Sequence, residues 1–104
     1  MSRVAFKMKL YPDSVDEYKR RHLEIWPGLV ELLKHVGISD YSIFIDEESS
    51  CLFAVLKADD ESSLDQLPHN PLMQQWWQYM SDIMETHSDN SPLSTPLKEV
   101  FYLP

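Results

Sequence analysis

The sequence predicts an α+β fold in which helices cover one face of an antiparallel sheet. Apolar residues alternate with period two in several short segments and follow helical spacing in the longer segments between them. The expected order is strand, helix, strand, strand, helix, strand, which is the order of the ferredoxin-like arrangement. A chain of 104 residues has a usual length for one domain. Because no repeat or long linker divides it, we expect a single domain over residues 1–104.

Alternation predicts three strands in the first half of the chain. Val4–Leu10 is the first, with an apolar residue at every second position. Tyr41–Ile45 and Cys51–Leu56 are the next two, and the polar segment Asp46–Ser50 lies between them. A short polar turn between two strands is typical of an antiparallel hairpin.

A helical pattern of apolar residues runs over Val15–Val36. Asp13 precedes it and is the expected N-cap. Pro27 interrupts the run, so we expect the helix to kink or to split after Trp26, because an interior proline removes a hydrogen bond and clashes with the preceding turn. We expect Trp26 itself to shape this helix end. Gly37 is the expected residue just beyond the helix.

The second half of the chain predicts two helices and one strand. Asp59–Gln66 is expected to form a short helix. Asn70 and Pro71 are typical of the start of another, with asparagine as N-cap and proline at the first helical position. Thr86–Pro96 is polar and contains proline, so we expect a loop. Leu97–Leu103 alternates and is the expected final strand.

Both faces of the expected strands carry large apolar side chains. The helices cover only one face, so the other is expected to avoid water. Packing against the sheet of a second copy would achieve this, and we therefore expect a homodimer.

The net charge of −8, from 17 acidic and 9 basic residues, argues against some partners. Binding to nucleic acid or to an anionic membrane depends on clustered Lys and Arg. The one tight basic group, at Lys19, Arg20 and Arg21, lies among acidic residues and is interpreted as a solvated helix face. We expect neither nucleic acid nor a membrane as partner.

Cysteine and glycine usage argues against metal and nucleotide chemistry. The single cysteine, Cys51, cannot form an internal disulfide and falls short of a Cys-based zinc site. The histidines lack metal-ligand spacing, and with two glycines there is no glycine-rich phosphate loop. No segment resembles a signal peptide or a membrane span. We expect a cytoplasmic protein without metal or cofactor.

His22 is the first candidate for chemistry. It follows Tyr18 by four residues, so both side chains lie on the apolar helix face that points towards the sheet. An imidazole, with an ordinary pKa of ~6.5, both donates and accepts protons near neutral pH. A buried histidine that merely satisfies its hydrogen bonds explains the spacing as well.

Trp76, Trp77 and Tyr41 are candidates for binding. Adjacent helical residues point ~100° apart, so one tryptophan can pack in the core while the other lines a cleft. Aromatic faces suit the polarised C–H groups of a sugar, although tryptophan is also a common core residue. Tyr41 faces the same way as Ile43 and Ile45, where its hydroxyl either meets a ligand or caps the core. Asp89 and Asn90 are expected to form an Asx turn.

Several strings together resemble the L-rhamnose mutarotase family over nearly the whole chain. The two most specific are the YxxRHxxIWP string that starts at Tyr18 and the WWxYM string that starts at Trp76. The departure we note is Gly28, where we expect an acidic residue. The other matching segments are Asp40–Phe44, Asp89–Pro92 and Glu99–Leu103.

The resemblance implies a dimeric α+β barrel that interconverts the anomers of L-rhamnose without a cofactor. It implies that His22 is the proton donor and that Tyr18, Tyr41, Trp76 and Trp77 bind the sugar. Our hypothesis is that His22 protonates the ring oxygen while Tyr18 orients the histidine or the sugar. L-fucose as substrate, a monooxygenase of the same architecture and a non-enzymatic sugar sensor are the alternatives.

Overall fold

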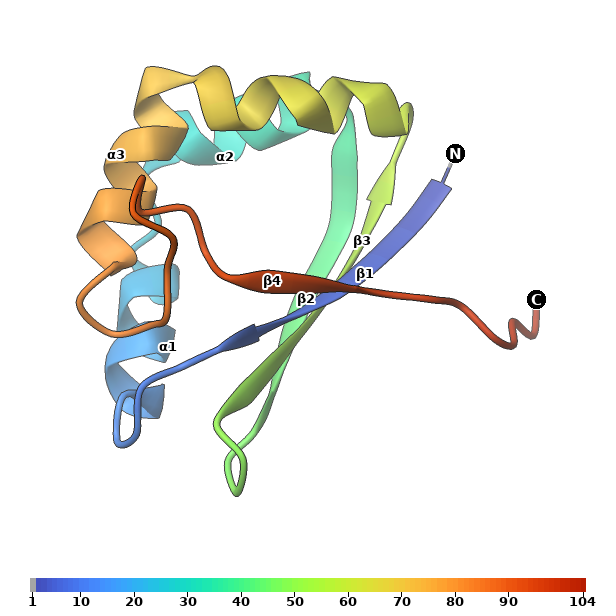
Figure 1. Ribbon diagram of the computed structural model, residues 1–104. Helices are drawn as coiled ribbons and strands as arrows, with labels where there is room; N and C mark the ends of the chain where they lie inside the picture. Colours follow the sequence, from blue (N-terminus) through green and yellow to red (C-terminus); the bar gives the residue numbers. More distant parts are fainter. Residues whose placement is uncertain (1) are drawn as a thin grey trace.

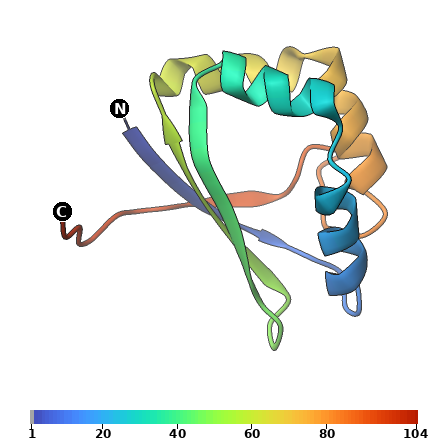
Figure 2. The same ribbon diagram turned by 180° about the vertical axis from the view of Figure 1, so that it is seen from behind.

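The computed structural model describes residues 2–104, and it confirms the ferredoxin-like arrangement (Figure 1). Four strands form one antiparallel sheet in the order β2-β3-β1-β4. The helices lie together on one face of this sheet, as the opposite view shows (Figure 2). The elements are β1 (Ser2–Lys9), α1 (Val15–Leu23), α2 (Pro27–His35), β2 (Ile38–Asp46), β3 (Cys51–Ala58), the 3-10 helix η1 (Glu61–His69), α3 (Pro71–Met80) and β4 (Ser94–Leu97).

Strand β3 shows how the sheet separates its two faces. Its residues alternate between buried and half-buried along the whole strand. The register pairs Met8 with Leu52 and Phe6 with Ala54. Opposite residues of an antiparallel pair point to the same face, so these four side chains lie together beneath the helices. Leu52 and Ala54 are at most 2% exposed, and the core therefore lies between the sheet and the helix layer.

Pro27 splits the long helical pattern, as expected. Helix α1 ends at Leu23, and α2 begins at Pro27 with Trp26 as N-cap. Proline is tolerated at the first helical position because its missing N–H has no partner there. Gly37 then has φ +92°, a conformation that strongly favours glycine.

Two helix starts test the capping predictions. Asn70 caps α3 as expected, since its side-chain oxygen accepts hydrogen bonds from the N–H of Leu72 at 2.9 Å and of Met73 at 3.4 Å. The prediction for Asp13 is wrong. Ser14 is the N-cap of α1, without a side-chain cap bond, and Asp13 lies in the turn before it with φ 63°.

The predicted final strand is misplaced. The strand is β4, Ser94–Leu97, of which all but Leu97 lie in the segment that was expected to be a loop. It pairs with β1 from Ala5↔Leu97 to Met8↔Ser94. Residues 98–104 run on beyond the sheet with exposed side chains (Figure 1). Alternation indicates which residues favour an extended chain, but strand pairing also requires a neighbour within reach. Among residues 94–104, only Ser94–Leu97 have such a neighbour in the sheet.

Both the tail and the outer sheet face expose apolar groups. Phe44 is 63% exposed on β2, and in the tail Val100, Phe101 and Leu103 are 77% exposed or more. Within residues 2–104, no helix is long and apolar enough to span a membrane.

Candidate functional site

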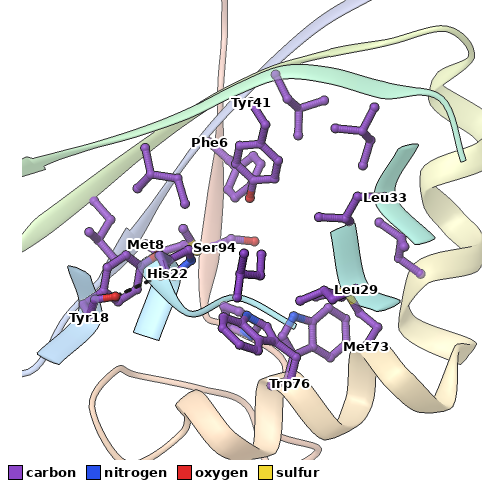
Figure 3. Close-up of a pocket in the computed structure, with 18 of the residues that line it drawn as sticks. Phe6, Met8, Tyr18, His22, Leu29, Leu33, Tyr41, Met73, Trp76 and Ser94 are labelled. Carbon is purple, nitrogen blue, oxygen red and sulfur yellow. Dashed lines mark hydrogen bonds between the residues drawn. The ribbon is translucent and has the colours of Figure 1, made fainter. Parts of the chain in front are cut away.

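A cavity of about 950 Å³ opens between the sheet and the helices (Figure 3). Side chains from every strand and from α1, α2 and α3 line it. Its wall is mostly apolar, with residues such as Phe6, Met8, Leu29 and Leu33. All five residues singled out from the sequence lie in this wall: Tyr18, His22, Tyr41, Trp76 and Trp77.

The imidazole of His22 is held in a defined tautomer. Its Nδ1 lies 3.0 Å from the backbone carbonyl oxygen of Tyr18. A carbonyl only accepts hydrogen bonds, so Nδ1 must carry the hydrogen. Burial lowers the pKa of His22 below its ordinary value of 6.5, and the bond to Tyr18 only partly opposes this. At neutral pH the ring is therefore uncharged, and Nε2 carries a free lone pair.

Two phenols stay protonated in the same cavity. The ring of Tyr18 lies 4.4 Å from the His22 ring, centroid to centroid, and burial raises the pKa of its hydroxyl. Burial also raises the pKa of Tyr41 to about 12. The residue Tyr41 is 39% exposed, but its hydroxyl end points into the cavity (Figure 3). Both hydroxyls are thus available as hydrogen-bond donors at neutral pH.

A β-bulge places Tyr41 in the cavity wall. The register of β2 against β3 shifts between Ser39 and Ser42, so that two residues of β2 stand opposite one of β3. Asp40, one of the two, has φ 48°. The bulge lets Ile38, on one side of it, and Tyr41, on the other, both point inward although three positions separate them. Bulges commonly redirect side chains in this way next to binding sites.

Trp76 forms the part of the cavity wall next to His22. It is 5% exposed, and its ring meets the His22 ring edge-on at 5.5 Å between centroids and 88° between planes. Trp77, the next residue, is half-buried and also lines the cavity. The expectation that one of the pair is more deeply packed than the other is confirmed, but both reach the cavity.

Behind Trp76 lies a second layer of aromatic rings. Trp26 meets the Trp76 ring edge-on at 5.1 Å and stacks on Tyr79 at 5.7 Å. The Tyr79 ring also lies 5.7 Å from that of Trp76. Trp26 was expected to have a structural role, and it supports the cavity wall from behind.

Arg21 contradicts the interpretation of the basic group as a solvated face. Its side chain is 8% exposed and hydrogen-bonds Glu17 on its own helix. It also bonds Asp82 and the backbone carbonyl of Tyr79, which are about sixty positions away in the sequence. Sequence spacing reveals the Glu17 contact, since four residues separate the two, but gives no signal for the distant partners. Lys19 and Arg20 are exposed, as expected.

Several polar residues of the wall, Lys34 and Ser39 among them, were missed from the sequence, and three more lie in the last part of the chain. Ser94 comes from β4, where the sheet register places it beside the inward-facing Met8. His87 and Ser91 come from the loop before β4. The Asx turn in this loop is confirmed, because Asp89 accepts from the N–H of Ser91 at 3.0 Å. If the last strand had been predicted at its true position, its pairing with β1 would have placed Ser94 in the cavity wall.

The sequence matches the family model described as L-rhamnose mutarotase over residues 3–103. The chain belongs to the L-rhamnose mutarotase family. The L-rhamnose mutarotase of Jannaschia sp. (strain CCS1) is 54% identical over 104 residues and 100% of both chains. That of Sinorhizobium fredii is 53% identical over 103 residues and 99% of both chains.

Solved structures agree with the family and with the fold. The crystal structure of an L-rhamnose mutarotase from Formosa agariphila superimposes with a TM-score of 0.93 at 48% identity, covering 100% of both chains. An antibiotic biosynthesis monooxygenase superimposes with a TM-score of 0.61 at 15% identity, covering 96% of this chain and 99% of that one. The second likeness shows a shared fold alone. Among residues 2–104, no group of three or more His, Cys, Asp or Glu is arranged to hold a metal ion.

Proposed function

We propose that this chain is an isomerase that interconverts the α and β anomers of L-rhamnose. The membership of the L-rhamnose mutarotase family supports the substrate. The observation that carries the chemistry is the neutral His22, with Nδ1–H bonded to Tyr18 and its ring edge-on to Trp76 in the cavity wall. Such a ring exchanges protons through Nε2 alone.

Mutarotation requires one proton to leave and one to arrive. In the opening step, Nε2 of His22 accepts the proton of the anomeric hydroxyl, and the C1–O5 bond breaks with its electron pair moving to O5. A donor protonates O5, and the open-chain aldehyde results. Rotation about C1–C2 turns the other carbonyl face to O5, and closure reverses both transfers. A positioned acid or base accelerates such a step by ~10²–10⁴-fold.

This proposal refines the hypothesis drawn from the sequence. In that hypothesis His22 protonates the ring oxygen, so its ring must first be a protonated imidazolium. Burial disfavours the imidazolium, so His22 is better suited to accept the anomeric proton during opening and to return it during closure. The hydroxyls of Tyr18 and Tyr41 are the protonated groups available to the ring oxygen and to the other sugar oxygens.

The remaining wall suits a neutral 6-deoxy sugar. Trp76 and Trp77 offer indole surface to the C–H groups of the pyranose and to its methyl group. The phenols of Tyr18 and Tyr41, on the α1 and β2 sides of the cavity, donate hydrogen bonds that fix the orientation of the ring. No redox or group-transfer step is involved, so the proposal needs no cofactor.

A homodimer is part of the proposal. The outer sheet face pairs Phe44 with Phe53, and Leu97 lies at its other side, 39% exposed. The apolar side chains of the tail after Leu97 are exposed as well, and the Tyr102 ring lies 4.4 Å from the guanidinium of Arg3 on β1. A second copy has the same apolar face and is thus a complementary partner. The expectations of a cytoplasmic location and of no binding to nucleic acid or membrane stay predictions.

Saturation-transfer NMR on equilibrated L-rhamnose tests the proposed reaction. Irradiation of one anomeric proton resonance should transfer saturation to the other only when the protein is present. L-fucose, measured in parallel, determines which 6-deoxy sugar is preferred. Sugar binding without faster anomer exchange would contradict the proposal and indicate a sensor. A Soret shift on incubation with haem, again without anomer exchange, would indicate a monooxygenase.

A further inference from the structure

Arg21 is the one buried charged residue of the described chain, and it lies outside the cavity. It directly precedes His22 on α1. A buried guanidinium is costly unless its donors are satisfied. Here each of the three nitrogens, Nε, Nη1 and Nη2, donates at least one hydrogen bond.

The guanidinium joins α1 to the end of α3. Nη1 and Nη2 donate to the two carboxylate oxygens of Asp82 at 2.8 and 3.2 Å. Nη1 also donates to the carbonyl oxygen of Tyr79 at 2.7 Å, near the C-terminal end of α3. Carbonyls at a helix C-terminus lack partners within the helix and favour a cation. Nε donates to Glu17 at 2.7 Å, which fixes the side chain to α1.

The same group supports the aromatic layer behind the site. Its central carbon lies 4.5 Å from the centroid of the Tyr79 ring. Tyr79 stacks on Trp26 and lies beside Trp76, whose edge meets His22. A continuous set of contacts thus leads from Arg21 through Tyr79 and Trp76 back to the neighbour of Arg21, His22.

We propose that Arg21 is a positioning residue that sets the spacing between His22 on α1 and Trp76 on α3. This inference rests on the proposed mutarotase function. The planar guanidinium bonds both oxygens of Asp82 while it also reaches Glu17 and the Tyr79 carbonyl, an arrangement that a lysine ammonium cannot reproduce. The spacing determines where a sugar held on the indoles stands relative to Nε2. A misplacement of ~1 Å can cost up to ~10²-fold in rate.

Arg21→Lys tests the proposal, because it keeps the positive charge and removes the planar guanidinium that bonds both oxygens of Asp82. We expect kcat per folded molecule to fall about tenfold or more, with a smaller change in KM. We also expect the pKa of His22, followed by NMR titration, to rise towards 6.5, because a looser contact between α1 and α3 admits water. Circular dichroism measures the folded fraction, and the observed rate is divided by it. A loss of stability alone would then change neither kcat per folded molecule nor the pKa of His22.

Arg3→Lys is the matched control. Arg3 is exposed on β1, outside the cavity wall and beside the Tyr102 ring, and we expect kcat and the His22 pKa to stay unchanged. Asp82→Asn is the second variant, for use where Arg21→Lys does not fold. The Asp82 side chain is 67% exposed, so the chain should tolerate the change, and we expect a kcat loss of about threefold.

The outcomes separate the two proposals. An active wild-type protein whose Arg21→Lys and Asp82→Asn variants keep kcat within about twofold and the same His22 pKa would overturn the role of Arg21 alone. A wild-type protein that does not accelerate anomer exchange would overturn the proposed function. Loss of rate with a raised His22 pKa in Arg21→Lys, and no change in Arg3→Lys, supports the positioning role.

Discussion

His22 donates its Nδ1–H to the backbone carbonyl of Tyr18, four residues earlier on the same helix, at 3.0 Å. The partner is main chain, so no substitution of the Tyr18 side chain removes it. Helix α1 itself therefore keeps Nδ1 occupied and leaves Nε2 as the group that exchanges protons.

Replacement of His22 by alanine removes this group. We expect kcat for anomer exchange to fall by ~10²–10⁴-fold, because the remaining wall can bind the sugar but cannot move its protons. Saturation-transfer NMR measures the rate. His35→Ala, an exposed histidine on α2, is the control and should retain the wild-type rate. A His22→Ala protein with the full rate would disprove the assignment.

The pH dependence follows from the lowered pKa of His22. The neutral form is active in the proposed mechanism, so kcat should be highest at about pH 8 and fall on acidification with a midpoint below 6.5, at the pKa of the folded protein. Acid also destabilises the fold in this range, because the unfolded chain binds the proton more readily than the buried ring. Rates and circular dichroism measured over the same pH series separate the two effects. A rate that rises on acidification would instead favour the imidazolium as the active form.

Tyr41→Phe removes a hydroxyl that points into the cavity and leaves the ring in place. The loss of one hydrogen bond to the sugar, ~0.5–1.5 kcal/mol, should raise KM by about two- to tenfold. Titration of L-rhamnose in the exchange experiment measures this. Tyr11→Phe, at a tyrosine outside the cavity wall, should leave KM unchanged. Equal KM values for Tyr41→Phe and the wild type would exclude a contact between this hydroxyl and the sugar.

The two glycines should respond in opposite directions to alanine. Gly28 lies at the second position of α2, and an added Cβ would meet only Leu72, at an ordinary contact distance of 3.4 Å. Gly28→Ala should stabilise the fold by ~0.4–1 kcal/mol. Gly37→Ala should destabilise it, because φ is +92° and the Cβ would lie 3.1 Å from that of Asp59. Urea unfolding measures both, and a destabilised Gly28→Ala protein would contradict this account of α2.

The proposed dimer interface is tested on the outer sheet face. Phe53→Lys places a charge in the middle of β3, opposite Phe44 and away from the cavity wall. We expect the protein to change from dimer to monomer in sedimentation equilibrium at the same concentration, because an unpaired charge opposes burial of the face. Lys57→Met, at the end of the strand, should keep the dimer. A wild-type protein that is already monomeric would refute the proposal.

Local patterns predicted much of this site. The spacing of Tyr18 and His22 indicates a shared helix face, and Pro27 indicates the break after Trp26; the structure confirms both. The predictions that failed depend on contacts between residues that are far apart in the sequence. The place of Ser94 is decided by its pairing with Met8, and the burial of Arg21 is decided by Asp82. Neither partner can be identified from neighbouring residues.

The bulge in β2 makes the site sensitive to the pairing register of this strand. Tyr41 points inward because one additional residue stands between it and the regular register that begins at Ile38. Had the register of Ile38 continued without the bulge, Asp40 would stand opposite Leu56 and Tyr41 opposite Val55, and the phenol would point to the opposite side of the sheet. Variants of this family in which the strand after Asp40 slips by one residue against β3 and loses the bulge should therefore lose sugar recognition even if every side chain of the cavity is retained.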